Sequence, residues 1–270
     1  MAVVEYDGTD FHGSQLQPGR RTVQGELEAA LSSYAGAPVR ASFAGRTDSG
    51  VHAAGQVVAF ELDRTASSEE VARAATALLP RDVAVREAMA VCQGFDPRRW
   101  ATGRRYRYCI LNRRRRSPLA ERFALHVGAR LDEEAMREAG ALLIGYRDFG
   151  AFGRPTQGDN TWRHVRCLEV TREADRITIV AEANAFLRHM VRLIVGALVD
   201  VGRGKYGPEE LQAVLSSPEK PSPSPAVAAK GLLLEAVSYD RERLGLGRGP
   251  WWSSEPLDAL AWSPSDNTVV

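Results

Sequence analysis

Two successive rounds of strand-like and helix-like segments constrain the fold of this chain more than any other feature of its sequence. In the first round, short apolar segments rich in β-branched residues alternate with segments in which apolar residues recur at helical spacing. A capping box formed by Ser67 and Glu70 begins one helix, which we expect to end at Pro80. The pattern predicts strands at residues 2–6, 56–62 and 82–88, and a helix at residues 23–34.

The second round repeats this order over the rest of the chain. It predicts strands at residues 106–111, 165–171, 177–183 and 231–239, and helices at residues 132–143 and 186–201, with a short helix opened by Pro208. Such alternation favours an α/β (α+β) protein with two halves, residues 1–102 and 103–240, each with its own sheet or sharing one. Residues 241–270 are rich in Gly, Pro, Trp and Ser, which predicts a poorly ordered tail.

The composition excludes several classes of protein. No apolar run reaches the roughly 20 residues that a membrane-spanning helix needs, and the first residues lack the basic and apolar regions of a secretory signal. The three cysteines, Cys92, Cys109 and Cys167, are odd in number and far apart, so we expect neither a disulfide framework nor a zinc motif. We therefore expect a cytoplasmic protein that does not associate with a membrane.

Basic and acidic residues nearly balance, and the distribution of the basic residues is more informative than their sum. The formal net charge is +1, and only three of the 35 basic residues are lysines. A GC-rich genome explains an excess of arginine, but it does not explain why arginines cluster between Arg98 and Arg116, interleaved with Trp100, Tyr106 and Tyr108. Because arginine forks match phosphates and aromatic rings stack on bases, this stretch indicates an RNA-binding surface. A solvated strand and turn explains it equally well.

The segment from Gly45 to Gly50 has the composition of a functional loop. Two glycines, which permit close backbone approaches, bracket Arg46 and Asp48. Residues two apart in an extended loop project to the same side, and a carboxylate held in this way can act on a ligand. An ordinary Asp-Ser-Gly turn with a surface ion pair accounts for the same spacing.

Five motifs of the chain resemble, in order, those of the tRNA pseudouridine synthase A (TruA) family. Together they run from Tyr6 to Tyr239, nearly the whole chain. The motifs are residues 6–13 with 22–27 (YDGTDFHG, TVQGEL), 45–52 (GRTDSGVH), 95–98 with 101–110 (FDPR, ATGRRYRYCI), 148–152 with 184–192 (DFGAF, NAFLRHMVR) and 229–232 (AKGL). Ser14 departs from the family, which commonly has a tryptophan at this position.

The resemblance implies an isomerase that converts uridine to pseudouridine at positions 38, 39 and 40 of the anticodon stem-loop of tRNA, with no metal and no organic cofactor. The base is detached at N1, turned, and rejoined through C5. Asp48 matches the family's catalytic aspartate, which acts at C1′ or as a base at C2′. Arg192 matches the arginine that pairs with this carboxylate, and Tyr106 matches the tyrosine placed against the target base.

The resemblance also implies a fold, a set of substrate contacts and an assembly. The fold has two similar halves with mixed, mainly antiparallel sheets joined around a central basic RNA-binding cleft, and the assembly is a homodimer that binds one tRNA across both subunits. The histidines at positions 52 and 189 are interpreted as structural or RNA-contacting. The residues expected to bind substrate are Arg46, Arg98, Arg104, Arg105, Tyr106 and Phe186.

Two other functions stay open at this point. A non-catalytic RNA-binding protein or tRNA chaperone would keep the arginine cluster without needing Asp48, Arg192 and Tyr106, and all three are present. A pseudouridine synthase that acts at another RNA position is poorly distinguished by sequence, because the choice of position depends on loops and RNA shape. Without the resemblance, Arg192 fits a surface arginine of a helix and Tyr106 a core residue of a strand.

Overall fold

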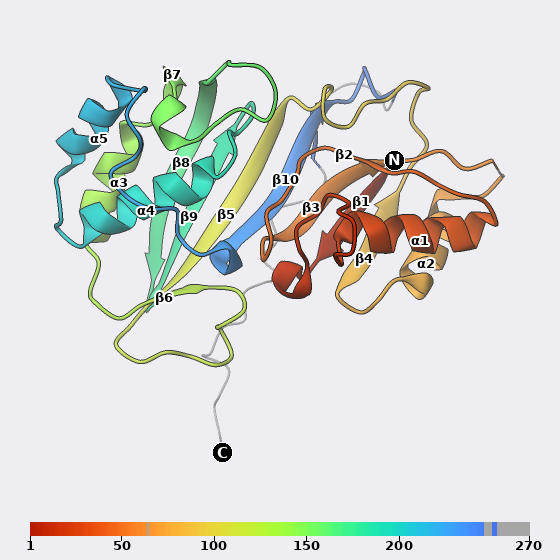
Figure 1. Cartoon of the computed structure of the whole chain (residues 1–270), viewed down its shortest axis with the longest axis horizontal. Coiled ribbons are helices and arrows are strands. Elements are labelled where there is room, and N and C mark those ends of the chain that lie inside the picture. Colours follow the sequence, from red (N-terminus) through yellow and green to blue (C-terminus); the bar gives the residue numbers. More distant parts are fainter. Residues whose placement is uncertain (64, 246–249, 253–270) are drawn as a thin grey trace.

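The chain folds around one mixed β-sheet, and its α-helices pack against one face of that sheet (Figure 1). The computed structural model describes residues 1–63, 65–245 and 250–252. The strands of the main path follow the order β4 (Val83–Ala88), β1 (Ala2–Tyr6), β3 (His52–Ala59), β10 (Leu232–Asp240), β5 (Gly103–Asn112), β9 (Arg176–Ala183), β8 (Trp162–Glu173) and β7 (Gly145–Asp148). The predicted α/β (α+β) class and the expected mixed, mainly antiparallel pairing are therefore confirmed.

The first half of the sheet has β1 at its centre, antiparallel to β3 on one side and to β4 on the other. Thr22 and Ser67 cap the two helices, because each side chain accepts a hydrogen bond from a backbone N–H three residues later. The elements are β1 (Ala2–Tyr6), η1 (Gly8–Asp10), α1 (Val23–Ala35), β2 (Ser42–Phe43), β3 (His52–Ala59), α2 (Ser68–Leu78) and β4 (Val83–Ala88).

The second half repeats this arrangement with β5 at its centre, antiparallel to β9 and β10. In each half, a helix follows the central strand and further helical turns precede the last strand. The elements are β5 (Gly103–Asn112), β6 (Leu125–Val127), α3 (Glu133–Ala141), β7 (Gly145–Asp148), η2 (Gly150–Phe152), β8 (Trp162–Glu173), β9 (Arg176–Ala183), α4 (Met190–Gly202), α5 (Pro208–Leu215), η3 (Ala229–Gly231), β10 (Leu232–Asp240) and β11 (Pro250–Trp252).

The last long strand, β10, joins the two halves. Leu233 and Leu234 of β10 pair in parallel with His52 and Ala53 of β3. The same strand contributes Leu232 to the hydrophobic core of the second half and Leu234 to that of the first half. The sheet is therefore continuous. The loops next to the strands at the junction, β3, β10 and β5, are brought close together.

Two elements begin four residues away from their predicted starts, the largest differences among the predicted elements. The long helix α4 begins at Met190 and not at Phe186, because His189 has a φ of 64° in the left-handed region, which interrupts a right-handed helix. The strand predicted at residues 56–62 begins instead at His52, where it pairs with β10. Neither a single backbone reversal nor a pairing with a strand about 180 residues later is visible in local periodicity.

The predicted division of the chain at residues 1–102 and 103–240 stays a prediction, since β10 takes part in both cores. Of the predicted tail, residues 241–245 and 250–252 are described, and Pro250–Trp252 forms β11, antiparallel to β10. The rest of that tail lies outside the described residues. Within the described part of the chain, no helix is both long and apolar enough to cross a membrane.

Candidate active site

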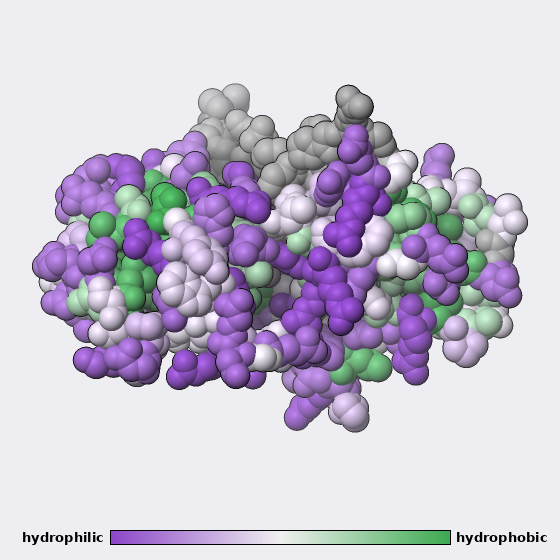
Figure 2. Space-filling model, turned by 90° about the horizontal axis from the view of Figure 1, so that it is seen from above, coloured by the Kyte–Doolittle hydropathy of each residue, from purple (hydrophilic) through white to green (hydrophobic). Residues whose placement is uncertain are grey.

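A pocket of about 740 Å³ lies where the two halves meet, and both halves line it. Seen from above, hydrophilic side chains crowd this middle part of the molecule (Figure 2). The first half contributes the loop before β3, and the second half contributes β5 and the segment around the start of α4. The predicted site residues found in the lining are Arg46, Asp48, Arg98, Arg104, Tyr106, Phe186 and Arg192.

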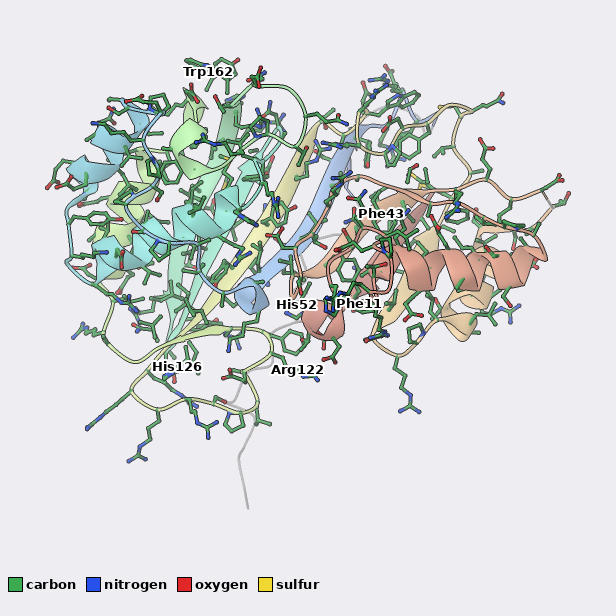
Figure 3. The ribbon with its side chains drawn as sticks, viewed as in Figure 1. Phe11, Phe43, His52, Arg122, His126 and Trp162 are labelled. Carbon is green, nitrogen blue, oxygen red and sulfur yellow. The ribbon has the colours of Figure 1, made fainter. Side chains whose placement is uncertain are left out.

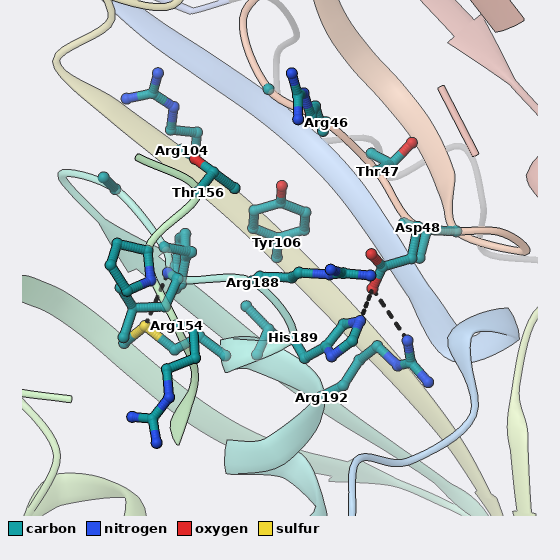
Figure 4. A pocket seen from close by; sticks show the side chains of 18 of the residues that line it. Arg46, Thr47, Asp48, Arg104, Tyr106, Arg154, Thr156, Arg188, His189 and Arg192 are labelled. Atoms are coloured by element: carbon teal, nitrogen blue, oxygen red, sulfur yellow. Dashed lines mark hydrogen bonds and ion pairs between the residues drawn. The ribbon is translucent and has the colours of Figure 1, made fainter. Parts of the chain in front are cut away.

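The carboxylate of Asp48 meets two basic side chains of the second half (Figure 4). Arg192 Nη1 donates a hydrogen bond to Asp48 Oδ2 at 3.0 Å, and His189 Nε2 lies 3.4 Å from the same oxygen. Arg192 Nε also donates to the carbonyl of Val227 at 2.7 Å, which fixes the guanidinium. The two residues matched by resemblance therefore meet across the pocket, and neither contact uses Asp48 Oδ1.

The loop that carries Asp48 is held by residues near the start of the chain. Ser14 Oγ accepts a hydrogen bond from Thr47 N at 2.9 Å, and Ser14 N donates to Thr47 O at 3.1 Å. Tyr6 Oη lies 2.8 Å from Thr47 Oγ1. Gly13 has a φ of 88°, and a Cβ there would lie 2.9 Å from Thr47 O, so the approach requires glycine. The supporting role of Ser14 was not predicted, and no local motif indicates it.

Tyr106 and Phe186 form the aromatic wall of the pocket. Their ring centroids lie 5.2 Å apart with the planes at 89°, the edge-to-face arrangement that aromatic pairs favour. Burial raises the pKa of Tyr106 above its ordinary value, and nearby Tyr6 and Asp48 act in the same direction. The phenol is therefore protonated at neutral pH, and it can both donate and accept a hydrogen bond.

Predicted and unpredicted arginines together surround the pocket. Arg46 is exposed in the lining, and Arg98 Nη2 donates to Thr156 Oγ1 at 2.5 Å, which links the two halves beside the pocket. Three more arginines that were not predicted as site residues also line it, although Arg188 lies within the motif at residues 184–192. These are Arg154, Arg163 and Arg188. Long-range folding brings Arg154 and Arg163 beside Arg188, and local sequence gives no signal of this proximity.

Arg105 is absent from the pocket lining, unlike the other predicted substrate-binding residues. Alternation along β5 places Arg105 and Arg107 on the sheet face opposite Tyr106. Arg105 Nε donates to Oε2 of the buried Glu235 at 3.0 Å, and Arg107 pairs with the other carboxylate oxygen. A contact of Arg105 with RNA stays a prediction, and it would lie on a surface other than this pocket.

The four consecutive arginines from Arg113 to Arg116 lie in the turn after β5 and are exposed. Figure 3 places this part of the chain at the lower edge of the molecule, near the labelled His126, whose Nε2 lies 2.8 Å from Arg113 O. Arg113 Nη1 also pairs with Asp175 at 3.3 Å. None of the four lines the pocket, so a contact with RNA would be remote from Asp48.

Comparisons with known proteins identify relatives over most of the chain. The sequence matches the profile of a family described as tRNA pseudouridine synthase over residues 2–98 and 139–240. It is 44% identical over 238 residues to the tRNA pseudouridine synthase A of Myxococcus xanthus, which covers 87% of this chain and 90% of the relative. Proteins of the same name match from Geobacter sulfurreducens, at 41% identity over 88% of this chain and 98% of the relative, and from Vibrio cholerae serotype O1, at 44% over 87% and 90%.

Proposed function

The chain belongs to the tRNA pseudouridine synthase family, and we propose that its pocket isomerises uridine to pseudouridine at positions 38, 39 and 40 of the anticodon stem-loop. Membership of the family makes the chain an isomerase that acts on uridine in tRNA. The proposal adds the positions in tRNA and the roles of individual residues. The observation that supports these roles most strongly is the meeting of Asp48, Arg192 and Tyr106 in one pocket.

Asp48 is the group proposed to act on the ribose. The reaction breaks the bond between C1′ and N1 and forms a bond between C1′ and C5, so a proton leaves C5 and one is gained at N1. A carboxylate serves such a reaction as a nucleophile at C1′ or as a base at C2′. Because Arg192 and His189 both contact Oδ2, Oδ1 is the oxygen that we assign to the ribose.

Tyr106 and Phe186 are proposed to receive the uracil once it has left the RNA stack. An enzyme that acts on a base within a structured RNA must take that base out of the stack and hold it in a pocket. The two rings supply an apolar wall for the base, and the protonated hydroxyl of Tyr106 supplies a hydrogen bond for the proton exchange at C5.

Arg46 and Arg98 are proposed to hold the phosphates on either side of the target nucleotide. Both lie in the pocket lining and belong to the first half of the chain, while Arg154 and Arg188 face the same space from the second half. Phosphate contacts fix the register of an RNA without reading its sequence. Four guanidiniums around one carboxylate therefore suit a ribose-phosphate backbone better than a free nucleoside.

The assembly and the cellular location are parts of the same proposal. We expect a homodimer that binds one tRNA across both subunits, as the resemblance implies. We expect the cytoplasm as the site of action, and the three cysteines of the described chain, which are free, agree with a reducing compartment.

Mapping pseudouridine in defined tRNA tests the proposal. Purified protein is incubated with a tRNA transcript that has uridine at positions 38, 39 and 40, and pseudouridine is located at single-nucleotide resolution. We expect product at these positions and nowhere else. The matched control is the same transcript with cytidine at the three positions, which should stay unmodified. Product outside the anticodon arm, or in the cytidine transcript, would contradict the assignment of positions.

A further inference from the structure

The guanidinium of Arg104 is occupied by backbone carbonyls of the protein itself. Nη1 donates to the carbonyls of Asn184 at 2.9 Å and Ala101 at 3.4 Å, and Nη2 donates to those of Arg98 at 2.8 Å and Ala44 at 3.1 Å. Two terminal nitrogens carry four N–H groups in total, so these bonds use all of them. The remaining donor is the single N–H at Nε.

This occupancy argues against the role in RNA binding that the sequence predicts for Arg104. An arginine recognises a phosphate or carboxylate by presenting two parallel N–H groups as a fork. Arg104 would have to give up carbonyl bonds to present such a fork, and it would leave partly buried carbonyl groups, among them that of Ala44, without this donor. Its guanidinium is also turned away from Asp48 in the pocket (Figure 4).

The four carbonyls belong to segments that must keep a fixed spacing for the site to work. Ala44 precedes the loop that carries Asp48 in the first half, and Asn184 follows β9 in the second half, two residues before Phe186. Arg104 itself lies on β5, two residues before Tyr106 and on the same sheet face. One side chain therefore ties the loop of the carboxylate to the strand of the tyrosine.

We propose that Arg104 is a positioning residue that sets the distance between Asp48 and Tyr106, and that it does not bind tRNA. The inference rests on the proposed function, in which these two residues act on the same nucleotide. A shift of about 1 Å in the placement of a reacting group is enough to lower a rate by roughly 10²-fold. Removal of the carbonyl bonds should therefore reduce the rate of the chemical step and leave the affinity for tRNA nearly unchanged.

The substitutions Arg104→Lys and Arg104→Ala test this inference, with Arg46→Ala as the matched control. Lys keeps the positive charge, but its one nitrogen cannot reach four carbonyls in a planar arrangement. Single-turnover rates at saturating tRNA and dissociation constants at several salt concentrations are measured for each variant. We expect both Arg104 variants to lose at least about tenfold in rate, with affinity within about twofold and an unchanged salt slope, as for a residue that does not touch a phosphate. Arg46→Ala should weaken binding and reduce the salt slope by roughly 0.7 to 0.9.

Either of two results would overturn the proposal. One is a full single-turnover rate in Arg104→Lys. The other is a reduced salt slope in Arg104→Ala, which would show that Arg104 binds a phosphate. Amide hydrogen exchange separates positioning from global unfolding: the Lys variant should exchange faster around residues 44–50 and 184–186, while α1 and α3 keep their protection. Loss of protection throughout α1 and α3 would also contradict a local role. Failure of the wild-type enzyme to isomerise uridine would refute the proposed function, and the exchange comparison would still decide the carbonyl contacts.

Discussion

A single oxygen of Asp48 takes both of its contacts with basic side chains, and this asymmetry defines how the carboxylate can act. Arg192 and His189 hold Oδ2, so Oδ1 is the oxygen proposed to meet the ribose. The substitution Asp48→Asn keeps the size of the side chain but removes its charge. We expect turnover to fall below detection while the dissociation constant for tRNA stays within a few-fold. Turnover close to that of the wild type would show that another group acts on the ribose.

The hydroxyl of Tyr106 can be tested separately from its ring. Tyr106→Phe keeps the edge-to-face contact with Phe186 and deletes only the hydrogen-bonding group. If that group takes part in the proton exchange at C5, kcat should fall by roughly 10²-fold, the lower range for acid–base groups, with KM changed much less. A change in KM alone would mean that the hydroxyl contributes to binding and not to chemistry.

The support that Ser14 gives to the loop of Asp48 can be tested by substitution. Its side chain is buried, and its Oγ accepts the hydrogen bond from Thr47 N. Ser14→Ala would leave that N–H without its acceptor, at a cost of about 1–3 kcal/mol in the free energy of unfolding. Denaturant unfolding measures this cost, and kcat should fall in parallel because the loop carries Asp48. Ser14→Thr, which keeps the hydroxyl, is the matched control; equal stability of the Ala variant and the wild type would contradict the supporting role.

Residues that lie within a family motif could be identified from the sequence. Residues whose role depends on tertiary contacts could not. Asp48 and Arg192 are 144 residues apart, and only their match to family motifs indicated that they meet. Arg154 and Arg188 reach the same pocket without any motif that assigns them a role. Arg104 lies within a matched motif, but its carbonyl contacts depend on three loops whose positions are set by the whole fold.

At the scale of the element, the start of α4 shows where periodicity is insufficient. Apolar residues continue at helical spacing back to Phe186, yet the helix begins at Met190. The segment before it is not helical, and it pairs with a neighbouring loop through an isolated bridge between Arg154 and Arg188. This course lets Phe186 pack against Tyr106 and brings His189 to Asp48. The contacts that build the pocket therefore override the helical spacing of apolar residues at positions 186–189.

The turn after β5, which carries Arg113 to Arg116, is a candidate for RNA binding outside the pocket. Replacement of Arg113 to Arg116 by serine should weaken tRNA binding and reduce the salt slope by roughly 0.7 to 0.9 for each phosphate that is no longer bound. The single-turnover rate at saturating tRNA should stay nearly unchanged, because none of the four lines the pocket. Filter binding across a series of salt concentrations measures both quantities. Affinity and slope equal to those of the wild type would identify the turn as a solvated hairpin end.

At the scale of the whole molecule, the two halves that share the active site are joined by the strand β10, which takes part in both cores, and by side-chain contacts across the junction. Within the continuous sheet, the halves meet through two parallel residue pairs between β3 and β10. Across the same junction run the ion pair of Asp48 with Arg192 and the hydrogen bond of Arg98 with Thr156. Because the halves carry different catalytic groups, any change that loosens this junction should lower activity before it unfolds either core.

His52 is the buried titratable group at this junction. Its Nδ1 accepts a hydrogen bond from Gly8 N at 3.1 Å in the first half, and Asp7 Oδ1 lies 3.1 Å from the same nitrogen. Its Nε2 lies 3.0 Å from the carbonyl of Arg122 and 3.2 Å from that of Lys230, both in the second half. The Gly8 N–H and the two carbonyls suit a neutral ring with the proton on Nε2, whereas the Asp7 carboxylate favours a proton on Nδ1. The side chain is buried among these contacts, and its interpretation as structural or RNA-contacting stays a prediction.

Burial lowers the pKa of His52 below its ordinary value of 6.5, although the charge of Asp7 opposes this shift. The unfolded chain therefore binds a proton near pH 6.5 that the folded chain does not yet bind, so stability is complete above this pH and falls as the pH drops below it. One such group changes the free energy of unfolding by at most about 1.4 kcal/mol per pH unit. Burial also lowers the pKa of the Met1 amino group, to about 6, with the same sign, so a variant is needed to isolate the histidine.

His52→Gln keeps a donor that can reach the carbonyls of the second half but cannot titrate. Denaturant unfolding at about pH 7.5 and pH 5.5 should give a smaller loss of stability for this variant than for the wild type, because the contribution of Met1 is common to both. Activity should also fall less for the variant than for the wild type between these two pH values. The reason is that His52 lies four residues after Asp48 and joins the halves that build the pocket. An equal loss of stability in both proteins would place the titrating group elsewhere and leave the junction insensitive to pH in this range.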